Sequence, residues 1–159
     1  MRTLIGILTV SDSRSLETDE SGPAIAAALA RIGFKEVERR LCHDEFQAIR
    51  TNLIELCDVC GAVFTTGGTG FSHRDITPSA TAAVLERQAD SISELIRIKG
   101  LEKTPFAHLS RGVSGIRGNT LVVNLPGSPK GAAQGIEAIA LLLTPILAAL
   151  AGDVCPVTE

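Results

Sequence analysis

The sequence predicts a three-layer α/β fold, in which helices cover both faces of a mostly parallel sheet and a small β-hairpin is attached. Two observations carry this prediction. Continuous apolar runs with β-branched residues occur at 4–10 and 61–66 and are typical of strands buried on both faces. Segments with helical apolar spacing separate these runs, and the alternation of strand and helix implies right-handed crossovers between parallel strands.

The first part of the chain predicts a strand, a helix and a second strand. The run 4–10 forms the first strand. Helical spacing of apolar residues begins at Gly22 and stops at Gly33, a residue suited to the end of a helix. The run 35–41 is more polar, so we expect a strand nearer an edge of the sheet.

A second helix and a third strand come next. Asp44 is placed to cap this helix, which carries Ile49, Leu53 and Leu56 on one face. The strand 61–66 leads directly into a glycine-rich loop.

The rest of the chain predicts three more helices and the hairpin. Turn residues that tolerate positive φ separate the two hairpin strands. The elements are a helix with Thr77 as cap and Pro78 at its first position, with apolar spacing continuing to Val84; a helix over 91–99; strands at 112–116 and 120–125 around the turn 117–119; and a long helix ending at about Leu150.

Length and composition limit the classes of function. The 159 residues show no repeat or linker, so we expect one domain over 1–159. Apolar residues make up 45% and charged residues 21%, which excludes general disorder. Aromatic residues are only 3%, without Trp or Tyr, and the net charge is −3. We therefore expect no nucleic-acid partner, because both stacking side chains and a positive surface are lacking.

The ends of the chain and the cysteines suggest a compartment. The first ten residues are too short for a signal peptide. The apolar stretch 136–150 is shorter than a membrane span and contains Glu137 and Pro145, so we interpret it as a buried helix and expect no membrane partner. We expect a cytoplasmic protein with free thiols. Cys57 and Cys60 have redox or metal spacing, but they precede a strand, which favours two buried core thiols.

Residues that carry chemistry follow the predicted strands. The segment 11–13 (Ser-Asp-Ser) follows the first strand, 43–45 (His-Asp-Glu) the second, the glycine-rich loop 66–70 the third, and 124–130 the last. In open α/β sheets, ligands bind at the carboxyl ends of the strands beside a topological switch point. This convergence predicts one binding site at that edge.

The loop after the third strand contains Gly67, Gly68, Thr69 and Gly70. Such a loop exposes backbone amides that can surround phosphate oxygens. It is neither a Walker A loop, since no Gly-Lys-Ser/Thr follows, nor the dinucleotide fingerprint. A tight turn imposed by packing is an equal alternative.

Two carboxylates are candidates for a metal site. Arg74 and Asp75 follow the glycine loop, so the guanidinium could hold a phosphate and the carboxylate a cation. A surface ion pair is the alternative. Asp44 could equally be only a helix cap, unless Asp75 lies near it at the same sheet edge.

The segment 126–130 is a candidate anion site, because Pro126, Gly127 and Ser128 lead into a helix that begins near Lys130. The alternative is an ordinary connection between a strand and a helix, with an exposed lysine. The pair 110–111, Ser110 and Arg111, could add a second cation.

Six ordered motifs resemble the MogA/MoaB-like molybdopterin-binding family, whose domain also occurs in gephyrin-like and plant cofactor-biosynthesis proteins. The resemblance covers nearly the whole chain. The motifs are TVSD at 9–12, DE at 44–45, TTGGTG at 65–70, RDITP at 74–78, LSR at 109–111 and NLPGSPK at 124–130. His43 stands where Pro is common before the DE pair, and we expect little effect from this change.

The resemblance implies the molybdopterin adenylyltransferase step of molybdenum cofactor biosynthesis. ATP and molybdopterin would give adenylyl-molybdopterin and pyrophosphate with Mg²⁺, in a cytoplasmic homotrimer whose product passes to a molybdate-inserting, MoeA-like protein. By motif, Asp44 and Asp75 are the catalytic, metal-holding carboxylates. The implied nucleotide and molybdopterin contacts are Ser11, Asp12, Gly67, Gly68, Thr69, Gly70, Arg74, Ser110, Arg111, Pro126, Gly127, Ser128 and Lys130.

Two other functions stay open from the sequence. The chain is as short as the compact MoaB-like branch, so a non-catalytic molybdopterin carrier is the first alternative. A nucleotide-binding scaffold that acts through its oligomer surface is the second. The intact pair Asp44 and Asp75 favours the enzyme over the carrier.

Overall fold

The computed structural model describes residues 1–153, so the last six residues of the predicted domain, Cys155 among them, lie outside the described part. The strands are β1 (Ile5–Val10), β2 (Val37–Cys42), β3 (Ala62–Thr66), β4 (Arg87–Gln88), β5 (Ser114–Arg117) and β6 (Thr120–Leu125). The helices are α1 (Ser21–Arg31), α2 (Phe46–Val59), α3 (Thr77–Ala82), α4 (Asp90–Leu101) and α5 (Pro129–Leu150), with a 3₁₀ helix η1 (Pro105–Leu109).

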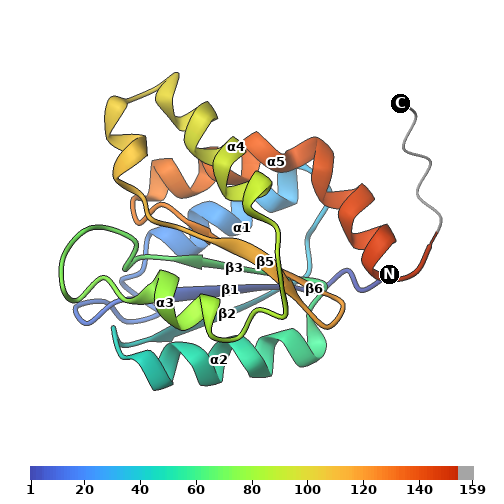
Figure 1. The fold of residues 1–159 in the computed structure, drawn as a ribbon, viewed down its shortest axis with the longest axis horizontal. Helices are drawn as coiled ribbons and strands as arrows, with labels where there is room; N and C mark the ends of the chain where they lie inside the picture. Colours follow the sequence, from blue (N-terminus) through green and yellow to red (C-terminus); the bar gives the residue numbers. More distant parts are fainter. Residues whose placement is uncertain (154–159) are drawn as a thin grey trace.

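The strands form one six-stranded sheet in the order β2-β1-β3-β6-β5-β4 (Figure 1). Pairing is parallel from β2 through β1 and β3 to β6, whereas β5 and β4 are antiparallel. The predicted hairpin is β5 and β6, and its turn contains Gly118 at φ +55°. The more polar β2 lies at an edge, as expected.

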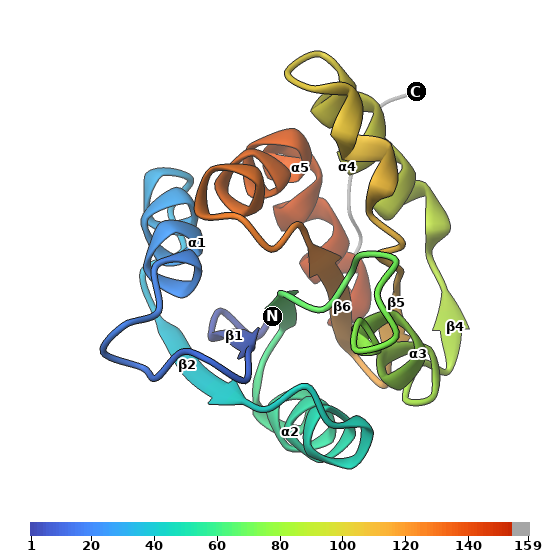
Figure 2. The ribbon, with the colours of Figure 1, turned by 90° about the vertical axis from the view of Figure 1, so that its left-hand side faces the viewer.

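Helices cover both faces of the sheet, which confirms the predicted three-layer class. Figure 2 views the molecule along the strands, with α1, α5 and α4 on one side of the sheet and α2 and α3 on the other. Two separate apolar clusters fill these layers. One joins α1, α4 and α5 to the sheet and includes Leu29, Phe64 and Ile136; the other joins α2 and α3 to the opposite face and includes Leu8, Leu53 and Val122.

The cysteine prediction is confirmed for the described residues. Cys42, Cys57 and Cys60 are buried free thiols. Burial raises the pKa of Cys57 to about 12 and that of Cys60 to about 11. The C-x-x-C pair therefore belongs to the core and not to a reactive site.

Two predicted helix caps are wrong. The Ncap residue of α2 is Glu45, and the backbone amide of Asp44 instead donates to Asp12 Oδ1 at 3.1 Å. The Ncap residue of α3 is Ile76, which places Thr77 inside the helix as its first residue. Neither helix has a side-chain cap. Both residues lie beside Gly68 at the loop edge of the sheet, and the backbone amide of Thr77 donates to the Gly68 carbonyl at 3.1 Å.

The last helix differs from the predicted buried segment. α5 begins at Pro129, before the apolar stretch 136–150, and its 22 residues are by length and composition enough to span a membrane. Only one face, which includes Ile136, Leu143 and Leu147, lies in the core. Leu141 on another face is 91% exposed. The interpretation as a buried core helix therefore holds for that face only.

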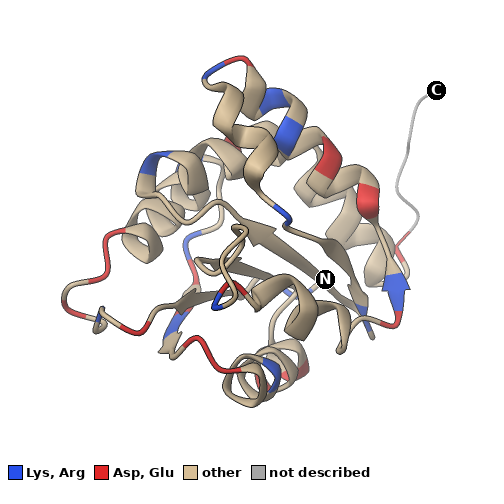
Figure 3. Cartoon of the chain, turned by 60° about the vertical axis from the view of Figure 1, so that its left-hand side comes forward, with Lys and Arg blue, Asp and Glu red and all other residues tan. Residues whose placement is uncertain are grey.

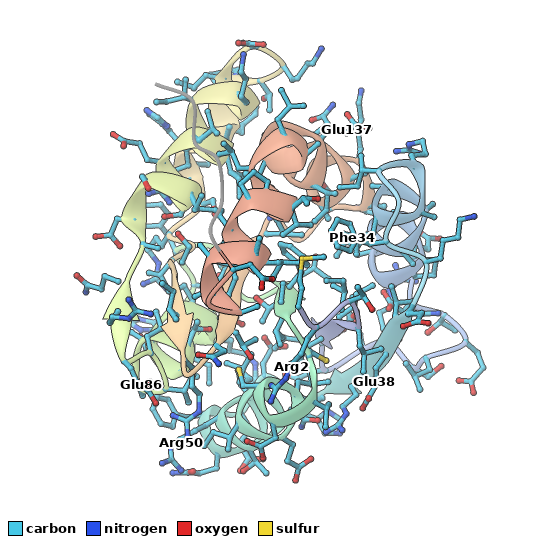
Figure 4. All side chains as sticks on the ribbon, turned by 90° about the vertical axis from the view of Figure 1, so that its right-hand side faces the viewer. Arg2, Phe34, Glu38, Arg50, Glu86 and Glu137 are labelled. Carbon is cyan, nitrogen blue, oxygen red and sulfur yellow. The ribbon has the colours of Figure 1, made fainter. Side chains whose placement is uncertain are left out.

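Short elements escaped prediction because their sequences carry little periodicity. β4 has two exposed residues, and η1 has no buried ones. At the amino edge of the sheet, seen in Figure 4, Arg2 precedes β1 and donates from Nη1 to the carbonyl oxygen of Cys57 at 3.1 Å. The residues of the candidate site all lie at the opposite edge.

Candidate active site

The site lies where the connections of β1 and β3 leave the sheet in opposite directions. β1 pairs with both β2 and β3, and the register sets Thr9 beside Thr66 at the carboxyl ends of β1 and β3. β6 continues the parallel order, with Leu125 beside Thr66. Four parallel strand ends therefore open onto the edge that faces the viewer in Figure 2. This arrangement is the switch point at which α/β sheets bind ligands.

The glycine loop follows β3 and has a backbone that only glycine adopts easily. Gly67 has φ +95° and Gly68 has φ +67°. A Cβ on Gly67 would lie 2.2 Å from the carbonyl oxygen of Val10, so the loop passes directly over the end of β1. Close packing and the dihedral angles both demand glycine here. The tight-turn interpretation is thus correct for the backbone, and it leaves the loop amides available to a ligand.

Both candidate carboxylates lie against this loop. Asp44 Oδ1 is 3.0 Å from the position that a Cβ on Gly68 would take, and Asp75 Oδ2 is 2.8 Å from the corresponding position at Gly70. The backbone amide of Ser72 donates to Asp75 Oδ2 at 2.9 Å, which fixes that side chain. The sequence allowed a metal role for Asp44 only if Asp75 lay near it. Both carboxylates lie beside the glycine loop, and Asp75 is near enough to raise the pKa of Asp44.

The charges of the site compete with one another. The pKa of Asp44 is raised, first because burial disfavours its charged form and also because the carboxylates of Asp12 and Asp75 are near. Arg74 acts in the opposite direction on Asp44. A bound cation would favour the ionised form of Asp44, so the carboxylates are placed to gain from one.

Arg74 pairs with Asp12 in this structure. Its guanidinium donates to Asp12 Oδ2, and this hydrogen bond is the main reason that the pKa of Asp12 is lowered. The other oxygen of Asp12, Oδ1, lies 3.5 Å from His43 Nδ1. Both Asp12 and Arg74 are exposed, and Figure 3 shows acidic and basic residues together on the loops of this edge. An incoming phosphate would compete with Asp12 for Arg74.

Arg111 supports the loop from the other side. Its backbone amide donates to the carbonyl of Thr69 at 2.9 Å, and its Nε donates to the carbonyl of Gly70 at 2.6 Å. A further hydrogen bond from Nη2 reaches the carbonyl of Asp75. Arg111 therefore holds the glycine loop to the segment after η1, a role that the sequence prediction of a phosphate-binding cation did not include. Ser110 Oγ accepts from the backbone amide of Gly112 at 3.2 Å.

The segment 126–130 closes the site beside α1. Thr66 Oγ1 donates to the carbonyl of Pro126 at 2.7 Å, and Ser21 Oγ donates to the carbonyl of Gly127 at 2.9 Å. Ser128 is the Ncap residue of α5 and accepts from the amide of Gly131 at 3.1 Å. Lys130 is exposed in the first turn. The start of α5 is thus fixed with its amides directed to the same edge.

Asp19 is a part of the site architecture that sequence reasoning missed. Its side chain is 2% exposed and accepts from Thr9 Oγ1 at 2.8 Å, from Arg39 Nη2 at 3.0 Å, and from the amides of Ser21 and Gly22. Burial alone would raise the pKa of Asp19, but these hydrogen bonds outweigh it and lower the pKa. The available signal was an Asp just before the predicted helix, because Asp side chains commonly accept from backbone amides two or three residues ahead.

A small hollow lies beside the first residues of the glycine loop. It has a volume of about 190 Å³ and lies between the end of β1, the glycine loop and the start of α5. Ser11 at its rim accepts from the amide of Arg14 at 3.1 Å. Its other lining residues include Thr66, Gly67 and Gly127. Hydroxyl-bearing residues dominate this lining, which also includes Arg14 and the acidic residues Asp19 and Glu20, so the hollow suits a polar ligand.

The described residues contain no cluster of three or more His, Cys, Asp or Glu side chains that could hold a metal alone. Mg²⁺ nevertheless binds through one or two carboxylates, waters and substrate phosphates. Asp44 and Asp75 beside the glycine loop fit that donor set. The cation would be shared with the substrate.

Comparison with known proteins settles the family. Residues 6–149 match the sequence model of the family described as "Probable molybdopterin binding domain". The chain belongs to this family. The matched segment contains every residue predicted for the site, from Ser11 to Lys130.

Named relatives cover most of this molybdopterin-binding domain. The molybdopterin adenylyltransferase of Helicobacter pylori is 40% identical over 146 residues, which are 87% of this chain and 83% of that protein. The protein of the same name from Escherichia coli K12 is 41% identical over 146 residues, with 87% and 75% covered. The solved structure of the molybdopterin biosynthesis enzyme MoaB from Thermus thermophilus is 42% identical, with a TM-score of 0.86, and the match covers 96% of this chain and 98% of that one.

Proposed function

We propose that this chain is a molybdopterin adenylyltransferase that transfers AMP from ATP to the terminal phosphate of molybdopterin. One observation carries the proposal: the glycine loop at the switch point lies beneath two carboxylates, Asp44 and Asp75. Relatives that are 40% and 41% identical are named for this activity. The product adenylyl-molybdopterin and pyrophosphate would serve molybdenum cofactor biosynthesis.

The chemistry needs no nucleophile from the protein. A terminal phosphate oxygen of molybdopterin attacks the α-phosphorus of ATP, and a new phosphorus–oxygen bond forms. The bond between the α-phosphorus and the oxygen that bridges to the β-phosphorus breaks, and pyrophosphate leaves with the electron pair. Because two anions must approach each other, catalysis depends on positioning and on charge neutralisation.

The residues of the site supply those two functions. The amides of Gly67 to Gly70 would bind nucleotide phosphates, and the amides at the start of α5 would bind a second anionic group beside Ser128 and Lys130. Arg74 would leave Asp12 and pair with a phosphate. Mg²⁺ held by Asp44 and Asp75 would supply charge neutralisation at the phosphates. Arg111 would keep the loop in place.

Further parts of the proposal concern the setting of the reaction. We propose a cytoplasmic protein, supported by the free thiols of Cys42, Cys57 and Cys60. We propose a homotrimer, supported by the exposed apolar face of α5 around Leu141. The resemblance further supports transfer of the product to a molybdate-inserting, MoeA-like protein.

A turnover assay tests the enzyme against the carrier alternative. Purified protein is mixed with molybdopterin, ATP and Mg²⁺, and both adenylyl-molybdopterin and pyrophosphate are measured. The proposal predicts equal amounts of the two products. Molybdopterin binding without either product would favour the carrier, as would a melting temperature that ATP–Mg²⁺ does not raise.

A further inference from the structure

Thr77 has a buried hydroxyl group without a partner. Its side chain is 0% exposed, yet Oγ1 makes no hydrogen bond to any described residue. Among the described side chains, one other buried polar atom is in this state, Nε of Arg39, and that guanidinium still donates to Asp19 through Nη2. Buried polar groups are nearly always paired, so the unused hydroxyl of Thr77 calls for an explanation.

The position of this hydroxyl is beside the candidate carboxylates. The backbone amide of Thr77 donates to the carbonyl of Gly68 at 3.1 Å, which joins the start of α3 to the glycine loop. A Cβ on Gly68 would lie 2.3 Å from Thr77 Oγ1 and 3.0 Å from Asp44 Oδ1. The hydroxyl and the carboxylate thus share the space that Gly68 leaves open.

A structural role alone does not account for a hydroxyl here. Burying a hydroxyl without a hydrogen bond costs free energy, and an apolar group of the same shape would avoid that cost. Valine has this shape. Threonine at this position therefore indicates a partner that is present in another state of the site.

We propose that Thr77 is a positioning residue whose hydroxyl donates a hydrogen bond to the Asp44 carboxylate when ATP–Mg²⁺ occupies the site. The amide of Asp44 is tied to Asp12, and Asp12 is paired with Arg74. A phosphate that draws Arg74 away releases Asp12 from this pair. Asp12 and the Asp44 backbone bonded to it can then shift together beside Gly68. One oxygen of Asp44 is then fixed by Thr77, and the other faces the ligand. This inference rests on the proposed function.

The test compares Thr77→Val with Thr77→Ser and with a matched control, Thr81→Val. Thr81 is equally buried in the same helix, but its hydroxyl is paired: it donates to the carbonyl of Thr77 at 2.8 Å and accepts from Asn124 at 2.9 Å. Three quantities are measured: the melting temperature without ligand, the rise in that temperature with ATP–Mg²⁺, and kcat/KM for adenylyl-molybdopterin formation.

The expected pattern separates stability from function. Thr77→Val melts at or above the wild-type temperature, by up to about 2–4 °C, because it removes an unpaired hydroxyl. It shows a smaller rise with ATP–Mg²⁺ and a kcat/KM lower by about tenfold or more, the scale of a hydrogen bond to a charged group. Thr77→Ser retains most of the rise in melting temperature with ATP–Mg²⁺ and most of the wild-type kcat/KM. Thr81→Val melts below the wild type.

Two results would overturn the inference. If Thr77→Val melts as low as Thr81→Val, the hydroxyl already has a partner in the resting protein. If Thr77→Val melts normally and keeps the wild-type rise and kcat/KM, the hydroxyl has no role in the loaded site. A wild type that makes no adenylyl-molybdopterin contradicts the proposed function instead, and the ATP–Mg²⁺ rise of the wild type and of Thr77→Val then decides the inference about Thr77.

Discussion

Gly67 shows how a single residue shapes the site. Its φ of +95° belongs to a region that other residues rarely adopt. A Cβ at this position would point at the carbonyl oxygen of Val10. Without a side chain at Gly67, the loop can cross the end of β1 beside the hollow that Gly67 lines. The phosphate-binding prediction for this loop depends on that crossing.

We expect Gly67→Ala to lower the free energy of unfolding by about 2–4 kcal/mol, since it adds both dihedral strain and a clash. Gly118→Ala is the matched control. Gly118 also has a positive φ, +55°, but a Cβ there would meet nothing within 4 Å, so only a dihedral cost of about 1 kcal/mol is expected. Urea denaturation measures both. Equal losses would mean that the close approach to Val10 contributes nothing.

Residue identity alone could not give the contacts of the two arginines. The sequence presents Arg74 and Arg111 as equivalent cations near the site. In the structure, Arg74 is paired with Asp12 at the rim, whereas Arg111 binds carbonyl oxygens of the glycine loop. Which acceptor a long side chain reaches depends on distances across the fold, and local sequence does not contain these distances.

At the scale of elements, long periodic segments were predictable and short ones were not. The buried strands β1 and β3 and the edge strand β2 follow directly from their apolar patterns. The two-residue β4 exists because it pairs with β5, a tertiary contact. The caps predicted at Asp44 and Thr77 failed because both residues make contacts with the glycine loop instead.

Asp19 connects three elements, β1, β2 and α1, and its substitution gives a prediction about how they are held together. It binds β1 through Thr9, β2 through Arg39 and the first amides of α1, while Ser21 continues the network to Gly127. We expect Asp19→Asn to lower the free energy of unfolding at pH 7 by about 3 kcal/mol, because it breaks a buried, charged network.

The pH dependence of that loss follows from the lowered pKa of Asp19. The stabilisation is complete above its ordinary value of about 3.8 and is lost as the pH falls through the lower folded value. Denaturation curves at pH 7 and near pH 3 should therefore show the wild type and Asp19→Asn converging in acid. Glu137→Gln is the control, since its pair with Arg31 is exposed and contributes at most about 1 kcal/mol (Figure 4 labels Glu137). A pH-independent gap would contradict this account.

At the scale of the whole molecule, the face of α5 that carries Leu141 is not covered by any of the described residues 1–153. Leu141 is 91% exposed and Leu142 lies beside it at the edge of a groove of about 670 Å³ between α4, η1 and α5. Phe106 from η1 is also exposed and lines the same groove. An apolar surface of this kind is typical of a protein interface.

We expect the protein to form a trimer with a mass of about 50 kDa, three times the chain mass of 16.7 kDa. Leu141→Glu should shift this species toward the monomer, because a charge would be buried in the interface. Size-exclusion chromatography with light scattering measures both. A wild-type monomer would contradict the trimer, and a Leu141→Glu trimer would place the interface elsewhere.

If the carboxylates above the glycine loop carry adenylyl transfer, removing either charge should abolish turnover, and parallel assays measure this. Wild type, Asp44→Asn, Asp75→Asn and Asp58→Asn are each supplied with molybdopterin, ATP and Mg²⁺; Asp58 is an exposed residue of α2 and is the control. We expect equal turnover for wild type and Asp58→Asn. We expect a loss of about 100-fold or more for each of the other two. Undiminished product from Asp44→Asn and Asp75→Asn would contradict this role of the carboxylates.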